Sequence, residues 1–123
     1  MEIQREILPE SYLLILTDEE NSLLDQETLA LALRSAVRSG KPSIWVDCSQ
    51  LHRLPAPTIS LLVGYYRRLQ QRNVQLVLCH LDDSLQHAFS QTSAATQVPV
   101  VPTLLDADLY CHAHLAGAPR ASA

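Results

Sequence analysis

The stretch from Ser43 to Arg72 places the tightest limit on how this chain can fold. It begins with a continuous apolar run centred on Ile44, Trp45 and Val46, which is typical of a strand buried on both faces. It continues into an amphipathic segment whose apolar residues recur at helical spacing, namely Ile59, Leu62, Val63, Tyr66 and Leu69. A buried strand followed closely by an amphipathic helix predicts an α/β domain with parallel strands.

The rest of the chain repeats this alternation of strand and helix. Strands are predicted over 3–8, where Pro9 ends an edge strand, and over 12–16, 74–81 and 98–101. Helices are predicted from Ser22 to Ser39, from Asp82 or Asp83, and from Thr103, which Asp106 follows at capping-box spacing. Gly40 and Asn73 are expected to end the two long helices in left-handed conformations. We therefore expect one domain over 1–116, with a central mixed sheet of four to five strands and about four helices, and a disordered tail over 117–123.

Composition excludes several classes of protein. With 123 residues, 47% apolar and 18% charged, the chain is long enough to bury a substantial core. A net charge of −4 does not favour binding to nucleic acid. Arg67, Arg68 and Arg72 are expected to complement the dipole at one helix end. No apolar run is long enough for a membrane span and no signal peptide is visible, so a cytoplasmic protein is predicted.

Residue types that often carry catalysis are present but poorly arranged for it. Cys48 and Cys79 lie in predicted buried strands, which indicates reduced core thiols, and His80 is expected to point away from Cys79 across the strand. Cys111 and His114 could share a helix face beside His112, but two ligands do not make a metal site. No glycine-rich phosphate loop is present. We expect no enzyme activity, no metal and no cofactor.

Three successive motifs resemble the STAS domain, a family named after sulfate transporters and anti-sigma factor antagonists. The first is Asp47-Cys48-Ser49-Gln50-Leu51, which ends a buried strand four residues before an amphipathic helix and a strand of the VQLVL type. The second runs from Leu81 to Phe89 and the third is Val98-Pro99-Val100-Val101 before a final helix. The resemblance covers roughly 12–114 and implies a STAS-type α/β fold.

The resemblance also implies a functional position at the start of the helix. Bacterial antagonists of this family carry Asp-Ser-Ser/Thr-Gly there, and a partner kinase that is also an anti-sigma factor phosphorylates the first serine. In this chain Pro55 takes the place of the aspartate, Ala56 of the phosphoacceptor, Pro57 of the next residue and Thr58 of the glycine. Alanine has no hydroxyl, so Ala56 cannot be phosphorylated. Thr58, Ser60 or Ser49 could serve as a displaced acceptor, or Thr58 could line the helix start while Ser60 is solvated.

A partner-binding surface is predicted around this position. We expect it to comprise Leu54, Pro55, Ala56, Pro57 and Thr58 from the loop and helix start, with Leu61, Tyr65 and Arg68 from the outer side of the helix. The alternative is that Tyr65 borders the core stripe and Leu61 is an ordinary exposed leucine. Asp47, with Ser49 beside it, is expected to brace the loop by accepting backbone N–H groups around Leu51 to Leu54.

The resemblance favours a non-catalytic interaction module of a bacterial signalling pathway that regulates transcription. The expected partner is an anti-sigma factor of the serine kinase type, and the chain is not expected to switch by phosphorylation at Ala56. One alternative is a small cytoplasmic subunit of an ABC lipid transporter, whose partner would be an ATPase subunit. A second alternative is a ligand-sensing domain, and a homodimer is compatible with each of these functions.

Overall fold

The computed structural model describes residues 2–17, 26–91 and 97–112. Its elements are β1 (Glu2–Ile7), β2 (Ser11–Thr17), α1 (Gln26–Arg38), β3 (Ser43–Gln50), α2 (Ala56–Gln70), β4 (Gln75–Cys79), α3 (Asp83–Ser90) and β5 (Val100–Val101). A further helix is described over 104–112. Within the described ranges this makes five strands and four helices, as the sequence predicts. The expected helix cap at Ser22, His114 and the expected tail over 117–123 lie outside the described residues.

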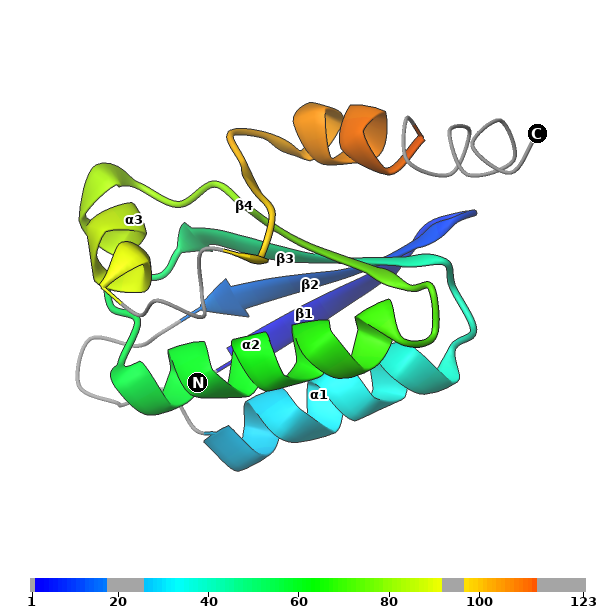
Figure 1. The fold of residues 1–123 in the computed structure, drawn as a ribbon, viewed down its shortest axis with the longest axis horizontal. Helices are drawn as coiled ribbons and strands as arrows, with labels where there is room; N and C mark the ends of the chain where they lie inside the picture. Colours follow the sequence, from blue (N-terminus) through cyan, green and yellow to red (C-terminus); the bar gives the residue numbers. More distant parts are fainter. Residues whose placement is uncertain (1, 18–25, 92–96, 113–123) are drawn as a thin grey trace.

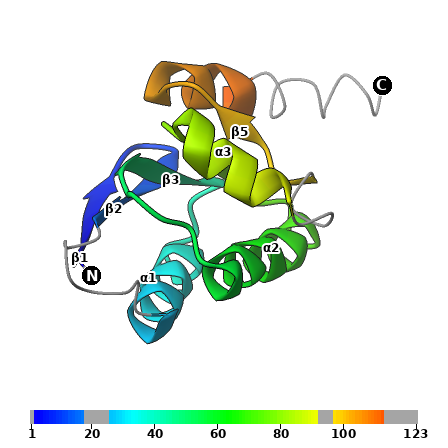
Figure 2. The same cartoon turned by 90° about the vertical axis from the view of Figure 1, so that its left-hand side faces the viewer.

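The five strands form one mixed sheet in the order β1-β2-β3-β4-β5 (Figure 1). β1 pairs antiparallel with β2, and the remaining neighbours pair in parallel. The crossovers through α1 and α2 place both helices on the same face of the sheet, where they lie side by side (Figure 2). Because both helices run back against parallel strands, they start at the end of the sheet where β3 and β4 finish.

Each face of the sheet has its own apolar cluster, as expected for strands covered on both sides. The larger cluster joins Leu14, Ile44 and Leu76 of the sheet to α1 and α2. The smaller one joins Leu13, Trp45 and Val77, the alternate residues of the same strands, to the 104–112 helix.

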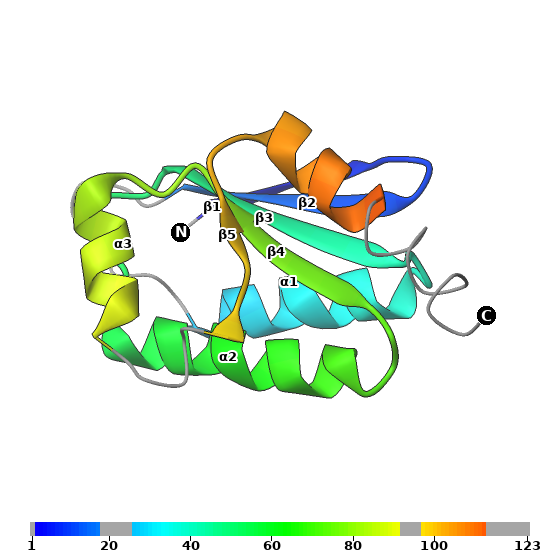
Figure 3. The same cartoon turned by 45° about the horizontal axis from the view of Figure 1, so that its top comes forward.

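α3 lies at the end of the sheet, beside the start of α2 (Figure 3). The start of α2 is therefore bordered by a short loop, by α1 and by α3.

Local signals in the sequence set the ends of the helices. Gly40 has a φ of 76° after α1 and Asn73 a φ of 59° after α2, the left-handed conformations expected at these two stops. Asp82 caps α3 by accepting the N–H of Leu85 at 2.8 Å. Thr103 Oγ1 accepts the N–H of Asp106 at 3.2 Å at the start of the last helix. Among the described residues, no helix combines the length and the apolar character that a membrane crossing requires.

Candidate docking surface at the start of helix α2

The loop between β3 and α2 is fixed to the core by two leucines. Leu51 and Leu54 are only 3% and 6% exposed, whereas His52 and Arg53 between them are exposed. The N–H of Leu51 also donates to the carbonyl of Cys48 at 3.1 Å, which turns the chain as it leaves the strand. With its two apolar residues buried, this short loop holds the start of α2 in a set position relative to the sheet.

Asp47 lies at the end of β3 and is nearly buried, with 7% of its surface exposed. One of its carboxylate oxygens accepts the backbone N–H of Ser49 at 2.9 Å, while Ser49 itself is exposed. A charged acceptor bond of this kind stabilises the turn at a strand end. The carboxylate thus organises the last residues of the strand, and this bond lies at Ser49 and not around Leu51 to Leu54, where it was expected.

The first turn of α2 lacks the polar capping groups that usually begin a helix. Its N-cap is Pro55, with φ −62° and ψ 151°, and no side chain caps the helix. The carbonyl of Pro55 instead accepts the N–H groups of Thr58 and Ile59 at 3.0 and 3.1 Å. Pro57 has no N–H to offer, and the turn contains no acidic residue. The partial positive charge of this helix end is therefore not balanced by a carboxylate of the first turn.

The residues that reach the surface here are small and apolar. Ala56 and Pro57 are exposed and Pro55 is half-buried. Leu54 and Thr58 were expected on the same surface, and this is wrong, because they are 6% and 1% exposed and lie in the core. Thr58 is one helical turn before Leu62, which is fully buried, so both side chains point toward the sheet.

Leu61 and Tyr65 lie in the seam between α1 and α2. Both are half-buried and pack against the larger core cluster. The Tyr65 hydroxyl donates to the carbonyl of Ala30 in α1 at 3.4 Å, and the guanidinium of Arg68 lies 5.3 Å from the centre of the Tyr65 ring. The structure thus matches the alternative in which Tyr65 borders the core stripe. Of the three outer-side residues, only Arg68 is exposed.

The hydroxyl groups near the helix start differ in their accessibility. Thr58 is 1% exposed, so a kinase cannot reach it without opening the helix start. Ser60, one turn into the helix, and Ser49, at the strand end, are exposed. Burial therefore excludes Thr58 as an acceptor in the folded protein and leaves Ser60 and Ser49 as the accessible hydroxyls.

The thiols of this chain are buried and unreactive in their environment. Burial, with smaller contributions from Cys79 and Asp47, raises the pKa of Cys48, and burial followed by the nearby Asp47 raises the pKa of Cys79 to about 12. Burial also raises the pKa of Cys111, whose sulfur accepts the indole N–H of Trp45 at 3.4 Å. Because the thiolate is the nucleophilic form, none of them has the character of a catalytic cysteine. Among the described residues, no cluster of three His, Cys, Asp or Glu side chains could hold a metal ion.

A cavity of about 510 Å³ lies at the other end of the sheet. The turn between β1 and β2 and the 104–112 helix form its walls, chiefly through Leu8, Leu104 and Leu105, and Trp45 lies at its base. At its rim, His112 contacts Glu10 at 3.2 Å and Asp108 at 3.1 Å. The Asp108 backbone carbonyl and carboxylate raise the pKa of His112, with a smaller contribution from Glu10. No local pattern in the sequence predicts this cavity, because its lining residues come from three segments far apart in the chain.

Known proteins resemble this chain both in sequence pattern and in fold. The family model of the STAS domain matches residues 18–107. A comparison with curated proteins finds no match. Among solved structures, an anti-sigma factor antagonist from Mycobacterium paratuberculosis is 18% identical with a TM-score of 0.77, and the alignment covers 90% of this chain and 93% of that chain.

Two further structures extend the comparison. An anti-sigma-factor antagonist (STAS) domain protein from Planctomyces limnophilus is 17% identical with a TM-score of 0.76, over 89% of this chain and 97% of that one. The Bacillus cell fate determinant SpoIIAA in its phosphorylated form is 18% identical with a TM-score of 0.63, over 86% of this chain and 96% of that one. At these identities the likeness shows a shared fold.

Proposed function

Because the chain belongs to the STAS domain family, we propose that it is a non-catalytic, cytoplasmic module that binds a regulatory protein through the start of α2. The contact surface comprises Pro55, Ala56 and Pro57, with the exposed Ser60 one turn further along the helix. Leu51 and Leu54 support this surface from below by fixing the loop to the core. The proposed partner is an anti-sigma factor of the serine kinase type in a bacterial pathway that regulates transcription.

One observation carries this proposal. The start of α2 presents exposed apolar side chains where a hydrophilic helix cap is the rule. A helix end without a capping side chain or a carboxylate in its first turn gives up stabilisation of about 1 kcal/mol. An exposed apolar surface on a fixed loop suits burial against another protein. The lost stabilisation is consistent with selection for binding at this position.

The same residues argue for binding without a phosphorylation switch. Ala56 is exposed but has no hydroxyl, and Thr58 has a hydroxyl but is buried. A phosphate adds roughly −1.5 to −2 charges, which is enough to change docking at a helix start. Without an acceptor at this position, the binding surface keeps one charge state, and we propose that it binds its partner constitutively.

Affinity purification from the cells that encode this chain tests the docking surface. The Ala56→Glu variant adds a carboxylate at an exposed position and is expected to lose the partner that the wild type captures. The matched control is Gln4→Glu, which adds the same charge at an exposed position of the distant strand β1. Retention of the same partner by Ala56→Glu would refute the docking surface.

The identity of the captured protein separates the candidate partners. A kinase-type anti-sigma factor supports the transcriptional role, whereas the ATPase subunit of a lipid transporter assigns the chain to that transporter. Incubation of the complex with ATP is expected to leave Ser49 and Ser60 unmodified. Phosphate on either residue, detected by mass spectrometry, would show that a displaced switch exists.

The cavity supports a second candidate function, ligand sensing. Its volume of about 510 Å³ lies in the range of small-molecule sites, and its walls are mainly apolar with a few polar groups at the rim. A thermal shift screen with nucleotides, lipids and other metabolites tests this function, because a ligand stabilises only the state that it binds. A stabilising compound should lose its effect in a Leu104→Trp variant, whose indole fills the cavity. An equal shift in that variant would place the ligand elsewhere.

A further inference from the structure

The acidic chain concentrates its basic residues on one pair of helices. The protein carries a net charge of −4, yet α2 contains no acidic residue and α1 contains only Glu27, in its first turn. Five arginines lie on these two helices or directly after them: Arg34, Arg38, Arg67, Arg68 and Arg72. All five are exposed. We call this set the arginine cluster.

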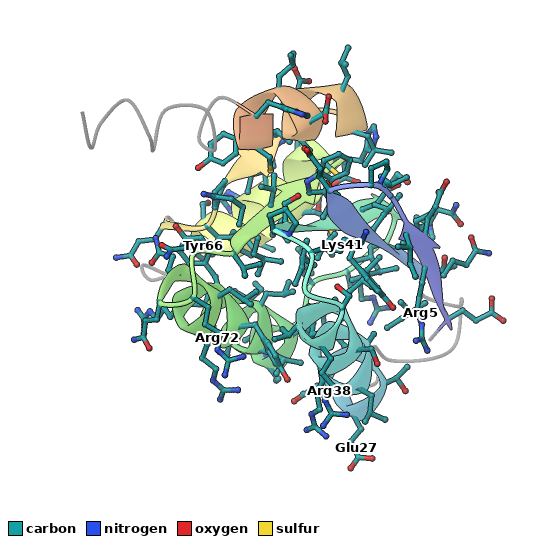
Figure 4. The ribbon with its side chains drawn as sticks, turned by 90° about the vertical axis from the view of Figure 1, so that its right-hand side faces the viewer. Arg5, Glu27, Arg38, Lys41, Tyr66 and Arg72 are labelled. Atoms are coloured by element: carbon teal, nitrogen blue, oxygen red, sulfur yellow. The ribbon has the colours of Figure 1, made fainter. Side chains whose placement is uncertain are left out.

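The fold brings these arginines to one end of the molecule. α1 and α2 run in the same direction on one face of the sheet, so their C-terminal ends lie together, at the end opposite the start of α2. Figure 4 shows Arg38 and Arg72 extending outward from these neighbouring helix ends. Arg68 is one turn before Arg72 and lies over the ring of Tyr65 in the seam between the helices. The cluster therefore spans two helices that lie side by side.

No carboxylate of the described chain forms an ion pair with these arginines. The ion pairs of His112 with Glu10 and Asp108 lie on the other face of the sheet. One basic residue near each helix end is enough to complement a helix dipole, and the dipole effect falls off within the last turn. Arg34 lies a full turn before Arg38, which is in the last turn of α1, so the dipole does not account for the whole cluster. Arg34 and Arg38 are four residues apart on α1, a spacing at which like charges repel until an anion binds.

We propose that the arginine cluster binds an acidic segment of a partner protein. Guanidinium groups hold carboxylates through paired N–H donors, and several of them on two neighbouring helices suit an extended row of carboxylates. Leu31 is 58% exposed on α1, one turn before Arg34, and offers an apolar contact that a polypeptide can use. This site goes beyond the docking surface at the start of α2, because it lies at the opposite end of the helix.

The charge distribution favours a short acidic segment over a large polyanion. Charges interact strongly only within about 10 Å at moderate salt, so a short segment experiences mainly the local field of the arginines. A membrane surface or a nucleic acid extends further and meets the field of the whole acidic protein, with its 13 carboxylate residues against 9 basic ones. A segment of partner polypeptide is thus the anion that the cluster can bind without opposition from the rest of the chain.

Fluorescence anisotropy with a labelled peptide of alternating glutamate and alanine tests this site. The wild type should bind the peptide at low salt, binding should weaken as salt increases, and a glutamine–alanine peptide should not bind. Arg72→Glu should weaken binding about tenfold, which corresponds to about 1.4 kcal/mol. The control Arg5→Glu makes the same charge change at an exposed position of β1 and should leave the affinity within a factor of about two.

Three outcomes would overturn the proposal. The first is equal peptide binding by Arg72→Glu and Arg5→Glu when both show the circular dichroism of the wild type. The second is binding to phosphatidylglycerol vesicles or single-stranded DNA as tight as binding to the peptide, which would make the cluster a general anion surface. The third is a wild-type dimer at low salt that Arg72→Glu abolishes, which would assign the surface to a second copy. None of these measurements depends on Ala56, so this site and the docking surface can fail independently.

Discussion

The buried thiol of Cys79 gives a prediction about stability at alkaline pH. Cys79 lies at the end of β4 with none of its surface exposed, paired in register with Asp47 of β3. Burial, together with the charge of Asp47, raises the pKa of this thiol from 9.0 to about 12. An unfolded chain loses the thiol proton near 9.0, whereas the folded protein keeps it up to about 12. Above pH 9 the unfolded state therefore binds fewer protons, and stability falls as pH rises until it levels off near 12.

The size of this loss of stability follows from the difference between the two pKa values. One pKa unit corresponds to about 1.4 kcal/mol. Ionisation of the Cys79 thiol in the unfolded chain should therefore lower the free energy of unfolding by about 1.4 kcal/mol between about pH 8 and about pH 10. The free energy of unfolding can be measured by urea titration with a reductant at both pH values. Cys79→Ala leaves a cavity, which lowers stability at both pH values alike. Between the two pH values, the free energy of unfolding of Cys79→Ala should fall by about 1.4 kcal/mol less than that of the wild type.

The comparison cancels the other groups that titrate in this range. The two proteins share every other ionisable group, and burial, not Cys79, is the main cause of the raised pKa of Cys48, so these contributions appear nearly equally in the two alkaline losses. An equal loss of stability in the wild type and in Cys79→Ala would refute the reasoning. It would mean that the thiol of Cys79 ionises in the folded protein as readily as in the unfolded chain.

Two further pairs of substitutions test the packing and the capping of the helices. Leu62→Ala, at a fully buried position of α2, should lower the free energy of unfolding by about 3 kcal/mol. Leu31→Ala, at a 58% exposed position of α1, should change it by less than about 0.5 kcal/mol. Similar losses in urea titrations of the two variants would contradict the orientation of the helices. Asp82→Ala removes the carboxylate that accepts the N–H of Leu85 and should cost about 1 kcal/mol, while Asp82→Asn, which keeps an acceptor, should cost less. Equal losses for the two Asp82 variants would show that the cap contributes through charge alone.

Several elements could be predicted because their signals are local. Gly40 and Asn73 end α1 and α2, and Asp82 starts α3, because backbone conformation and capping depend on a few neighbouring residues. The strand positions followed from continuous apolar runs, which only a sheet covered on both faces can bury. The mixed sheet then followed from the alternation of strands and helices.

The composition of the docking surface was harder to predict. Helical periodicity correctly identified the stripe that contains Leu62, but it could not show how wide the buried sector of α2 is. That width depends on α1, which lies beside α2 and contacts Tyr65, and on the surrounding core, which buries Thr58 and half-buries Leu61. A surface predicted from one helix alone therefore included residues that a neighbouring element buries.

The sequence by itself determined the family, the order of elements and the absence of a hydroxyl at Ala56, because these are properties of single residues and local patterns. Only the tertiary structure decided which residues around Ala56 reach the surface and which hydroxyls a kinase can approach. It also decided that His112 meets Glu10 at the rim of a cavity and that the arginines of α1 and α2 lie on neighbouring helices. These relations depend on contacts between segments far apart in the chain, and packing alone determines such contacts.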